Sequence, residues 1–311
     1  MEFYHKSVLF DETIDGLNIR DGKVYLDGTI GGAGHSSEIL RRLNGTGLLI
    51  GIDQDDNALE KSEKVLSEIN NNFKLFKSNY RDFDEILDKL KIDKVDGILL
   101  DLGVSSHQFD EGERGFSYNF DARLDMRMDT SKDFSAWDIV NGYSKDDLTN
   151  IMKKYSEEKW ASRIAEFIVK EREIKPIDTT FELVEVIKKA IPASARRKKG
   201  HPAKKTFQAL RIETNNELGV LENTLGKMID RLNPGGRIAI ISFHSLEDRI
   251  VKETFKYYFK DCICPDNAPI CICDKKREIN IITRKPVTAT EEELKDNNRA
   301  HSAKLRVAEK L

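Results

Sequence analysis

A short apolar strand that runs into a cluster of glycines constrains this chain more than any other stretch. Residues 24–27 read VYLD, and Gly28, Gly31, Gly32 and Gly34 follow at once. Glycine lets a backbone turn tightly and approach a ligand without a Cβ in the way. A helix is expected directly after the turn, and its N-terminal N–H groups favour a negatively charged ligand group. The stretch therefore predicts a strand, a ligand-binding turn and a helix.

Strand-like and helical segments then alternate as far as residue 101. The apolar runs 48–53 and 95–101 predict two further strands. Residues 58–69 have helical spacing after a cap at Asp55 or Asp56. Because strands that alternate with helices pair in parallel, this pattern predicts an α/β fold with a parallel sheet covered on both faces.

The alternation stops after residue 101, and the segment from about 107 to 214 contains loops and amphipathic helices without a convincing strand. A capping box at 144–147 opens one of these helices. We therefore predict one domain formed by residues 1–106 and 215–311, interrupted by a helical insert over residues 107–214.

The late part of the chain returns to the strand pattern. One long helix is predicted from about Lys205 to Leu232, ended by the sequence NPGG at 233–236. The run 237–243 predicts a strand, and a second capping box at 245–248 opens the next helix. Strand-like segments close to the C-terminus complete the sheet.

Asp53 ends the second predicted strand, about 20 residues past the glycine turn, where an acid accepts hydrogen bonds from ribose hydroxyls. The glycine turn and Asp53 together indicate an adenosine cofactor, and both NAD and S-adenosylmethionine fit this pattern. The glycines read G-x-x-G-G-x-G rather than the G-x-G-x-x-G typical of NAD, and the helical insert occupies the place of the second half-sheet that NAD requires. A LNPGGR turn before a late strand is typical of methyltransferases with this sheet, so the methyl donor is favoured.

Ligands of open α/β sheets lie outside the carboxyl ends of the strands, where Asp27, Asp53, Asn79, Tyr80 and Asp101 are expected. Tyr80 either lies against an adenine ring or packs at the sheet edge. Asp101 either caps a helix or acts on the ligand, by orienting the donor's amine or by accepting a hydrogen bond from an incoming amine.

Two histidines stand near the predicted site. His35 follows the glycine turn and could contact the cofactor, and His244 follows the late strand. Histidines at strand ends are often structural residues, so neither is predicted to carry protons during a reaction.

Four cysteines, Cys262, Cys264, Cys271 and Cys273, fall in the stretch CICPDNAPICIC. Four thiolates can hold a zinc ion. Zinc knuckles usually place two residues between paired cysteines, however, and each pair here has one. The alternative is a cysteine-bearing hairpin in a reducing cytosol.

The net charge of −3 does not indicate a nucleic-acid partner, so such a partner requires a local basic patch. Residues 192–211 contain no Asp or Glu. A charge run is usually a solvated face, but an acid-free stretch in so acidic a chain suggests phosphate contacts. The candidate RNA-binding residues are Arg196, Arg197, Lys198, Lys199, Lys204 and Lys205.

No apolar run approaches the roughly 20 residues of a membrane span, and the first residues lack the apolar core of a signal peptide. The chain is therefore expected in the cytoplasm, without a membrane partner.

Several longer motifs together resemble the RsmH (MraW) family of bacterial methyltransferases, nearly from end to end. They are DGTIGGAGHS, DLGVSSHQ, RGFSY, LDMRMD, KKTFQALRIETNNEL, SFHSLEDRIVK and IITRKPVTATEEE. The resemblance implies a class I (Rossmann-like) S-adenosylmethionine-dependent methyltransferase sheet with an inserted all-helical domain. It also implies methylation of N4 of a cytosine in the decoding region of 16S rRNA, within the small ribosomal subunit.

The resemblance also implies the site residues. The donor-binding positions fall on Ala33, Gly34, His35, Asp53, Tyr80, Asp101 and Gln108. Asp101 is the candidate catalytic residue, and the target cytosine is expected to leave its stack to reach it. The family does not depend on a cysteine cluster, so no metal is predicted. One departure, Ala122-Arg123 where the family has Gly-Pro, puts the shape of that loop in question.

Two other functions stay open on the sequence alone. A non-catalytic RNA-binding factor for ribosome assembly could keep the same fold, although the intact glycine turn, Asp53 and Asp101 speak against it. An NAD-dependent oxidoreductase is the second alternative. The oligomeric state is not fixed by the sequence, and a homodimer is left open.

Overall fold

The computed structural model describes residues 7–103, 112–196, 200–265 and 270–311. The chain forms two units. Unit 1 comprises residues 1–103 and 218–311, and unit 2 comprises residues 104–217. The boundaries expected from the sequence, 106/107 and 214/215, lie close to these divisions.

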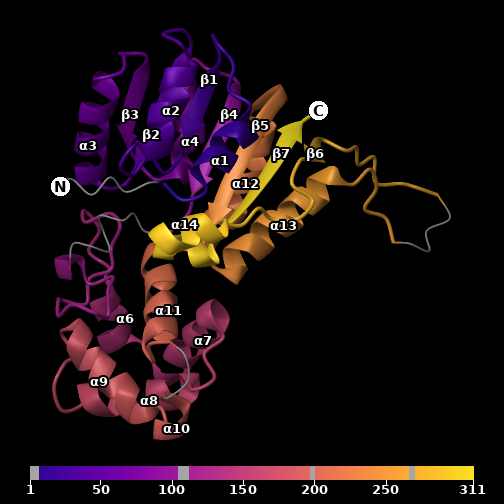
Figure 1. Ribbon diagram of the computed structural model, residues 1–311. Coiled ribbons are helices and arrows are strands. Elements are labelled where there is room, and N and C mark those ends of the chain that lie inside the picture. Colours follow the sequence, from indigo (N-terminus) through magenta and orange to yellow (C-terminus); the bar gives the residue numbers. More distant parts are fainter. Residues whose placement is uncertain (1–6, 104–111, 197–199, 266–269) are drawn as a thin grey trace. The chain divides into compact units, whose positions relative to one another are not determined.

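Unit 1 is built on a sheet in which the described strands follow the order β3-β2-β1-β4-β5-β7-β6 (Figure 1). The strands are β1 (Val24–Asp27), β2 (Leu48–Asp53), β3 (Phe73–Lys77), β4 (Val95–Asp101), β5 (Leu232–Ser242), β6 (Ile279–Ile281) and β7 (Lys304–Lys310). The first five pair in parallel, and β7 and β6 are antiparallel additions beside β5. The class I methyltransferase sheet expected from the sequence is confirmed.

Helices cover both faces of this sheet (Figure 1). They are α1 (Phe10–Leu17), α2 (Gly34–Arg42), α3 (Asp56–Ser67), α4 (Phe83–Lys89), α12 (Glu217–Asp230), α13 (Ser245–Phe259) and α14 (Glu291–Asp296), with the 3-10 turns η1 (Tyr80–Asp82) and η3 (Asn298–Ser302). Side chains of β4 alternate between two cores, as a strand requires. Ile98 and Leu100 pack with residues of α4, α12 and α13, whereas Leu99 packs with residues of α1 and α2.

The predicted long helix from Lys205 to Leu232 is wrong, because two helices occupy this stretch. α11 (Lys204–Asn215) ends at Asn216, which takes a left-handed conformation with φ of 50°, and α12 begins at Glu217. A left-handed residue cannot continue a right-handed helix, so one asparagine is enough to separate them.

The NPGG sequence does not end a helix but lies inside β5. Leu232 pairs with Val95, and the next pair joins Arg237 to Gly97, so the extra residues form an irregularity within the strand. Gly235 has a φ of 76° there, which glycine adopts without strain.

Two predicted helix starts are confirmed and one is shifted. The Asp55 side chain accepts from Asn57 N at the start of α3, and Ser144 Oγ accepts from Asp147 N at the start of α7 (Lys145–Ser156). The capping box of α13 begins at His244 rather than at Ser245. The His244 Nδ1 accepts from Glu247 N, whereas a box at 245–248 would have Ser245 Oγ accept from Asp248 N.

Unit 2 is helical. Besides α7 and α11 it contains η2 (Gly112–Arg114), α6 (Ala136–Gly142), α8 (Ala161–Arg172), α9 (Thr180–Ala190) and α10 (Ala193–Arg196). Among its described residues, the only β pairing is an isolated bridge between Arg123 and Thr179. Its core has its own set of buried apolar side chains, separate from the two cores of the sheet.

The loop that carries Ala122-Arg123 is firmly held within unit 2. Ala122 N donates to Thr180 Oγ1 over 3.1 Å, and Thr180 N donates to the Ala122 carbonyl over 2.8 Å. The following Leu124 and Met126 are fully buried. The loop therefore keeps its place through backbone pairing and burial, without the Gly-Pro pair that the family pattern has.

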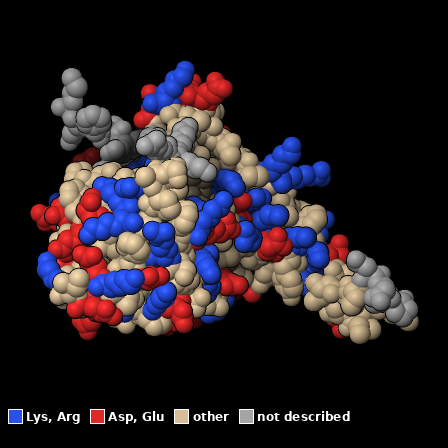
Figure 2. Space-filling view, turned by 90° about the horizontal axis from the view of Figure 1, so that it is seen from below, with Lys and Arg blue, Asp and Glu red and all other residues tan. Residues whose placement is uncertain are grey.

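Charges of both signs are interspersed on the face of the molecule shown in Figure 2. This pattern agrees with a surface of many ion pairs rather than a uniformly basic one. None of the described helices is both long and apolar enough to cross a membrane.

Candidate functional site

A buried carboxylate holds the glycine turn in shape. Asp27, the last residue of β1, accepts from Thr29 N over 3.0 Å and from Ser36 Oγ over 2.6 Å. Burial raises the pKa of Asp27 to about 6, while the bonds from Ser36 and Thr29 oppose the rise. Since Thr29 lies in the turn and Ser36 in α2, one side chain ties the strand, the turn and the helix together.

The turn needs small residues at specific points. A Cβ at Gly28 would lie 2.6 Å from Leu100 Cδ2 and 3.0 Å from Tyr80 Cβ, and a Cβ at Gly34 would lie 2.0 Å from Ser7 Oγ. Ala33, between them, has a left-handed φ of 59° and precedes α2 as its N-cap. A side chain larger than hydrogen at Gly28 would therefore push Tyr80 away from the turn.

Asp53 connects the glycine turn to the end of β2. Its Oδ2 accepts from Gly31 N over 2.9 Å, and its Oδ1 accepts from Asp55 N over 3.0 Å. The residue is partly exposed. Burial of its carboxyl raises the pKa of Asp53, and the backbone bonds limit the rise. The two carboxylate oxygens offer about four lone pairs, more than the bonds from Gly31, Asp55 and Gln54 use, so the side chain can also accept from a ribose hydroxyl.

Tyr80 stands beside the turn from the next strand. Asn79 caps η1 by accepting from Arg81 N, and its Nδ2 donates to Gln54 Oε1 over 2.9 Å. These bonds fix the ends of β2 and β3 relative to each other. Tyr80 follows directly, and the close approach of its Cβ to Gly28 places it against the glycine turn.

Asp101 ends β4 at the centre of this group. Its backbone N donates to Thr29 Oγ1 over 2.7 Å. Its carboxyl Oδ1 is buried and has no hydrogen-bond partner among the described residues. Burial raises the pKa of Asp101 to about 8, and the negative charges of Asp27 and Glu247 add to the rise. A buried carboxyl oxygen without a hydrogen-bond donor lowers the stability of the folded protein. A cationic ligand group that donates to it would offset this loss.

His35 lies next to Asp101 but is neutral. Its Nε2 is 3.2 Å from the Val8 carbonyl, its Nδ1 is 3.9 Å from Asp101 Oδ2, and the ring stacks on Phe10. Burial lowers the pKa of His35 to about 4. A carbonyl only accepts hydrogen bonds, so Nε2 carries the proton and Nδ1 presents a lone pair to the Asp101 carboxyl.

The comparisons with known proteins agree with this geometry. The family model described as the MraW methylase family matches residues 2–311. The chain belongs to this family of methylases.

Two relatives in this family cover the whole chain. A protein of Clostridioides difficile (strain 630) named ribosomal RNA small subunit methyltransferase H is 58% identical over all of both chains. One of the same name from Finegoldia magna is 59% identical, again over all of both chains. Among solved structures, an rRNA methylase from Streptococcus thermophilus is 12% identical with a TM-score of 0.42, covering 96% of this chain and 95% of that one.

The methyl donor of this methyltransferase is S-adenosyl-L-methionine. The residues at the carboxyl ends of β1 to β4 fit this group. Asp53 can accept from the ribose, and Tyr80, which lies against Gly28, offers an aromatic face. The unpartnered Oδ1 of Asp101 suits a molecule with a positively charged sulfur and an ammonium group.

The structure brings together six of the seven predicted donor-binding residues, around the glycine turn and the strand ends beside it. Gln108 lies outside the described residues. The roles of these residues toward the donor stay predictions. What the sequence interpretation missed is the organising role of Asp27, which is signalled only by the hydroxyl residues Thr29 and Ser36 that follow it.

His244 serves the fold of this methylase. Its Nδ1 accepts from Glu247 N, and the Glu247 carboxylate accepts from Phe243 N and His244 N. The Nδ1 atom is thus occupied in capping α13, and Nε2 lies 3.1 Å from Glu247 Oε1. That His244 does not carry protons stays a prediction.

Half of the predicted basic patch is described. Arg196, Lys204 and Lys205 are exposed, whereas Arg197, Lys198 and Lys199 lie outside the described residues. Lys205 Nζ donates to the Glu157 carbonyl at the end of α7, over 2.9 Å. These three side chains stay candidates for phosphate contacts.

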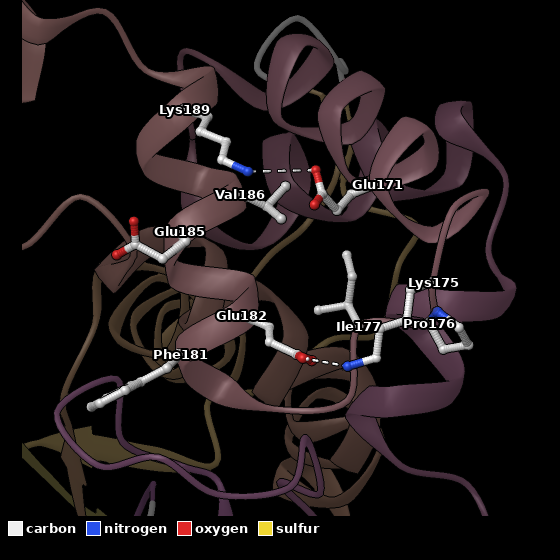
Figure 3. A pocket seen from close by; sticks show the side chains of 9 residues that line it. All are labelled: Glu171, Lys175, Pro176, Ile177, Phe181, Glu182, Glu185, Val186 and Lys189. Atoms are coloured by element: carbon white, nitrogen blue, oxygen red, sulfur yellow. Dashed lines mark hydrogen bonds and ion pairs between the residues drawn. The ribbon is translucent and has the colours of Figure 1, made fainter.

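A hollow in unit 2 lies between the end of α8 and α9 (Figure 3). Its lysines are paired with acids, Lys175 with Glu182 over 2.7 Å and Lys189 with Glu171 over 3.7 Å. Because these positive charges are balanced, the hollow is poorly suited to an anion, and the chemistry of the family points instead to the strand ends.

The Asp53→Ala variant tests the ribose contact. We expect its Kd for S-adenosyl-L-methionine to rise by at least about tenfold, because a hydrogen bond to a charged group contributes about 1.5–3 kcal/mol. Isothermal titration calorimetry measures the change. Asp56→Ala is the matched control, since Asp56 lies three residues after Asp53, in the first turn of α3, but is exposed, with Lys77 as its partner. Equal affinities of the two variants would contradict the assignment.

Donor affinity should also depend on pH through Asp101. Its folded pKa of about 8 lies above the ordinary value, so below pH 8 the carboxyl must lose a proton before it can pair with a cation. We expect the affinity to fall by up to about tenfold per pH unit as pH drops from 8 to 6.

The Asp101→Asn variant separates this effect from the titration of the donor's own amine. Calorimetry of both proteins between pH 6 and 9 should show a pH slope that is steeper in the wild type. Parallel slopes would show that the Asp101 carboxyl does not take part.

Proposed function

We propose that this chain transfers a methyl group from S-adenosyl-L-methionine to the exocyclic N4 amine of a cytosine in the decoding region of 16S rRNA, within the small ribosomal subunit. The observation that carries the proposal is the buried, unpartnered carboxyl oxygen of Asp101 beside the glycine turn. The relatives at 58% and 59% identity are named for the small-subunit ribosomal RNA. The choice of cytosine N4 rests on the resemblance of the motifs to the RsmH family.

The cytosine amine is a weak nucleophile because its lone pair is delocalised into the ring. Bound S-adenosyl-L-methionine supplies an electrophilic methyl group on a positively charged sulfur. What the chain must add is alignment and a hydrogen-bond acceptor for the amine. Asp101, in its ionised form, can accept from the amine N–H and so raise the electron density on nitrogen.

Neighbouring residues keep Asp101 ready for this role. Its backbone is fixed by Thr29, and the neutral His35 places no positive charge beside it. The carboxylate therefore stays free to interact with the cationic donor and with the amine rather than with a permanent protein cation. An amine that enters this site must come from an unstacked base, so the cytosine is flipped out of its helix.

Unit 2 is the part of the chain that we propose to hold the RNA. Arg196 in α10 and Lys204 in α11 are exposed on it. Phosphate contacts by such residues position an RNA without reading its sequence. The proposal does not require a second copy of the chain.

The decisive experiment uses small ribosomal subunits from cells that lack the gene. Purified protein with labelled S-adenosyl-L-methionine should transfer label to 16S rRNA, and mass spectrometry of the digested RNA should find N4-methylcytosine in the decoding region. Asp101→Ala should reduce transfer by at least about a hundredfold. Asp93→Ala, an exposed acid outside the site, is the control.

Each outcome has a distinct meaning. Label on another base or another atom would overturn the proposed substrate while leaving the methyltransferase intact. Tight binding of the subunit without any transfer would instead favour a non-catalytic role in ribosome assembly.

The basic patch can be tested by charge reversal. The double variant Arg196→Glu, Lys204→Glu should weaken binding to 16S rRNA. The slope of log Kd against log salt concentration should become shallower by about the amount that one to two phosphate contacts contribute. Lys170→Glu with Lys188→Glu changes the net charge equally, but these lysines are ion-paired with Glu166 and Glu185. If both double variants bind alike, the patch is only a solvated face.

A further inference from the structure

The four cysteines come together in the segment that links α13 to β6. Figure 1 shows this segment leaving the sheet of unit 1 beyond the end of α13. Its described residues run up to 265 and from 270 onwards, and both cysteine pairs belong to them. All four sulfur atoms lie within 4.8 Å of one another. The sequence interpretation had assigned no metal here.

The distances between the sulfurs have the size that one small metal ion requires. Cys271 Sγ lies 3.5 Å from Cys262 Sγ and 3.6 Å from Cys273 Sγ. Cys264 Sγ lies 4.0 Å from Cys271 Sγ, and Cys273 Sγ lies 3.7 Å from Cys262 Sγ. Four sulfurs in a regular tetrahedron about 2.3 Å from a zinc ion are about 3.8 Å apart. The observed separations lie on both sides of that value.

The C-x-C spacing explains how the sulfurs converge. In extended chain, residues two positions apart point to the same side. Cys262 and Cys264 therefore face one way and Ile263 the other, and the same holds for Cys271, Cys273 and Ile272. Two extended segments with this alternation can present four sulfurs to a common point. The usual two-residue spacing of zinc knuckles is thus not necessary.

Backbone N–H groups point at the sulfurs as well. Ile263 N donates to Cys273 Sγ over 3.4 Å, and Ile272 N donates to Cys264 Sγ over the same distance. Cys264 N donates to Cys262 Sγ over 3.3 Å. Such N–H···S bonds stabilise the thiolate, which is the form of cysteine that binds metals.

Burial does not hold this segment together. Ile263, Ile270 and Ile272 are 45%, 76% and 84% exposed, so they form no core. The described residues are anchored where the chain returns to the sheet, where Lys275 pairs with Glu278 and Arg277 lies over the Phe259 ring. A segment without a core usually depends on a disulfide or a metal for its shape.

A disulfide does not account for the arrangement. All four cysteines are free, and the shortest sulfur separation, 3.5 Å, is far above the roughly 2.05 Å of an S–S bond. An iron–sulfur cluster does not fit either, because its cysteines bind different iron atoms and cannot all lie so close to one point. Tetrahedral coordination by four thiolates is typical of zinc.

We propose that Cys262, Cys264, Cys271 and Cys273 bind one Zn²⁺ ion in a closed, tetrahedral, structural site. On binding, the thiols lose their protons and four Zn–S bonds form, so that no position is left for water or substrate. The ion fixes the segment between α13 and β6 and holds the three isoleucines on its outer side. This inference does not depend on the methyl-transfer function.

The test begins with the full-length protein purified without chelators. Elemental analysis by mass spectrometry should find one zinc per chain. Cobalt added to the metal-free protein should give the visible absorption bands of a tetrahedral thiolate complex, with saturation at one equivalent. The Cys262→Ser, Cys271→Ser double variant should lose both signals. Ile263→Ser, Ile272→Ser is the matched control in the same segment and should keep them.

The outcomes separate the alternatives. Protein that contains no zinc, gives no cobalt spectrum and has four freely titrating thiols would overturn the proposal, and so would a disulfide or bound iron in place of zinc. Donor affinity provides the check on folding, since the cysteine variant should bind S-adenosyl-L-methionine as the wild type does. If that affinity is retained while zinc is lost, the loss reports the site itself and not an unfolded protein.

Chelation offers a second readout on the unmodified chain. Removal of zinc should make the segment between α13 and β6 the first site of proteolytic cleavage, because its described isoleucines are exposed and form no core around the cysteines. Added zinc should restore resistance. A cleavage pattern that is the same with and without chelator would contradict a structural role for the ion.

Discussion

The buried carboxylate of Asp27 is the interaction on which the site depends. It accepts from the turn at Thr29 and from the helix at Ser36, and Thr29 in turn accepts from the backbone of Asp101. The turn and α2, which follow β1 directly, and the end of β4, which is distant in the sequence, are thereby fixed to one strand end. The glycines make the turn sterically feasible, but hydrogen bonds to a buried acid give it one shape.

Asp101 shows how a fold can keep a group available for a ligand. Burial raises the pKa of Asp101, the neighbouring acids add to the rise, and burial keeps the adjacent His35 neutral. Among the described residues, no ion pair joins a lysine or an arginine to its carboxyl, and His35 is the one basic residue beside it. A protein selected for stability alone would place a hydrogen-bond donor of its own beside this carboxyl. A site that binds a cationic methyl donor leaves that position to the ligand.

Much of this could be predicted from the sequence, because strand–turn–helix units follow local rules. The strands, the cap at Asp55 and the acid at position 53 all follow from spacing that a single segment contains. The failures are also physical. Asn216 breaks a helix through one left-handed residue, His244 caps where serine was expected, and the Asn-Pro-Gly-Gly sequence fits inside a strand because β4 pairs on both sides of it. The first two depend on the conformation of a single residue, and the third depends on a partner strand that is distant in the chain.

The pairing of β4 with β5 has a consequence for how the protein is made. These neighbouring strands are separated in the chain by the whole of unit 2. Since synthesis proceeds from the N-terminus, the inserted unit leaves the ribosome before the strand that completes the middle of the sheet. The edge of β4 that pairs with β5 therefore stays unpaired until β5 has been synthesised. If unit 2 folds first, the flexible chain between β4 and β5 is shorter, and the entropic cost of bringing the two strands together is lower.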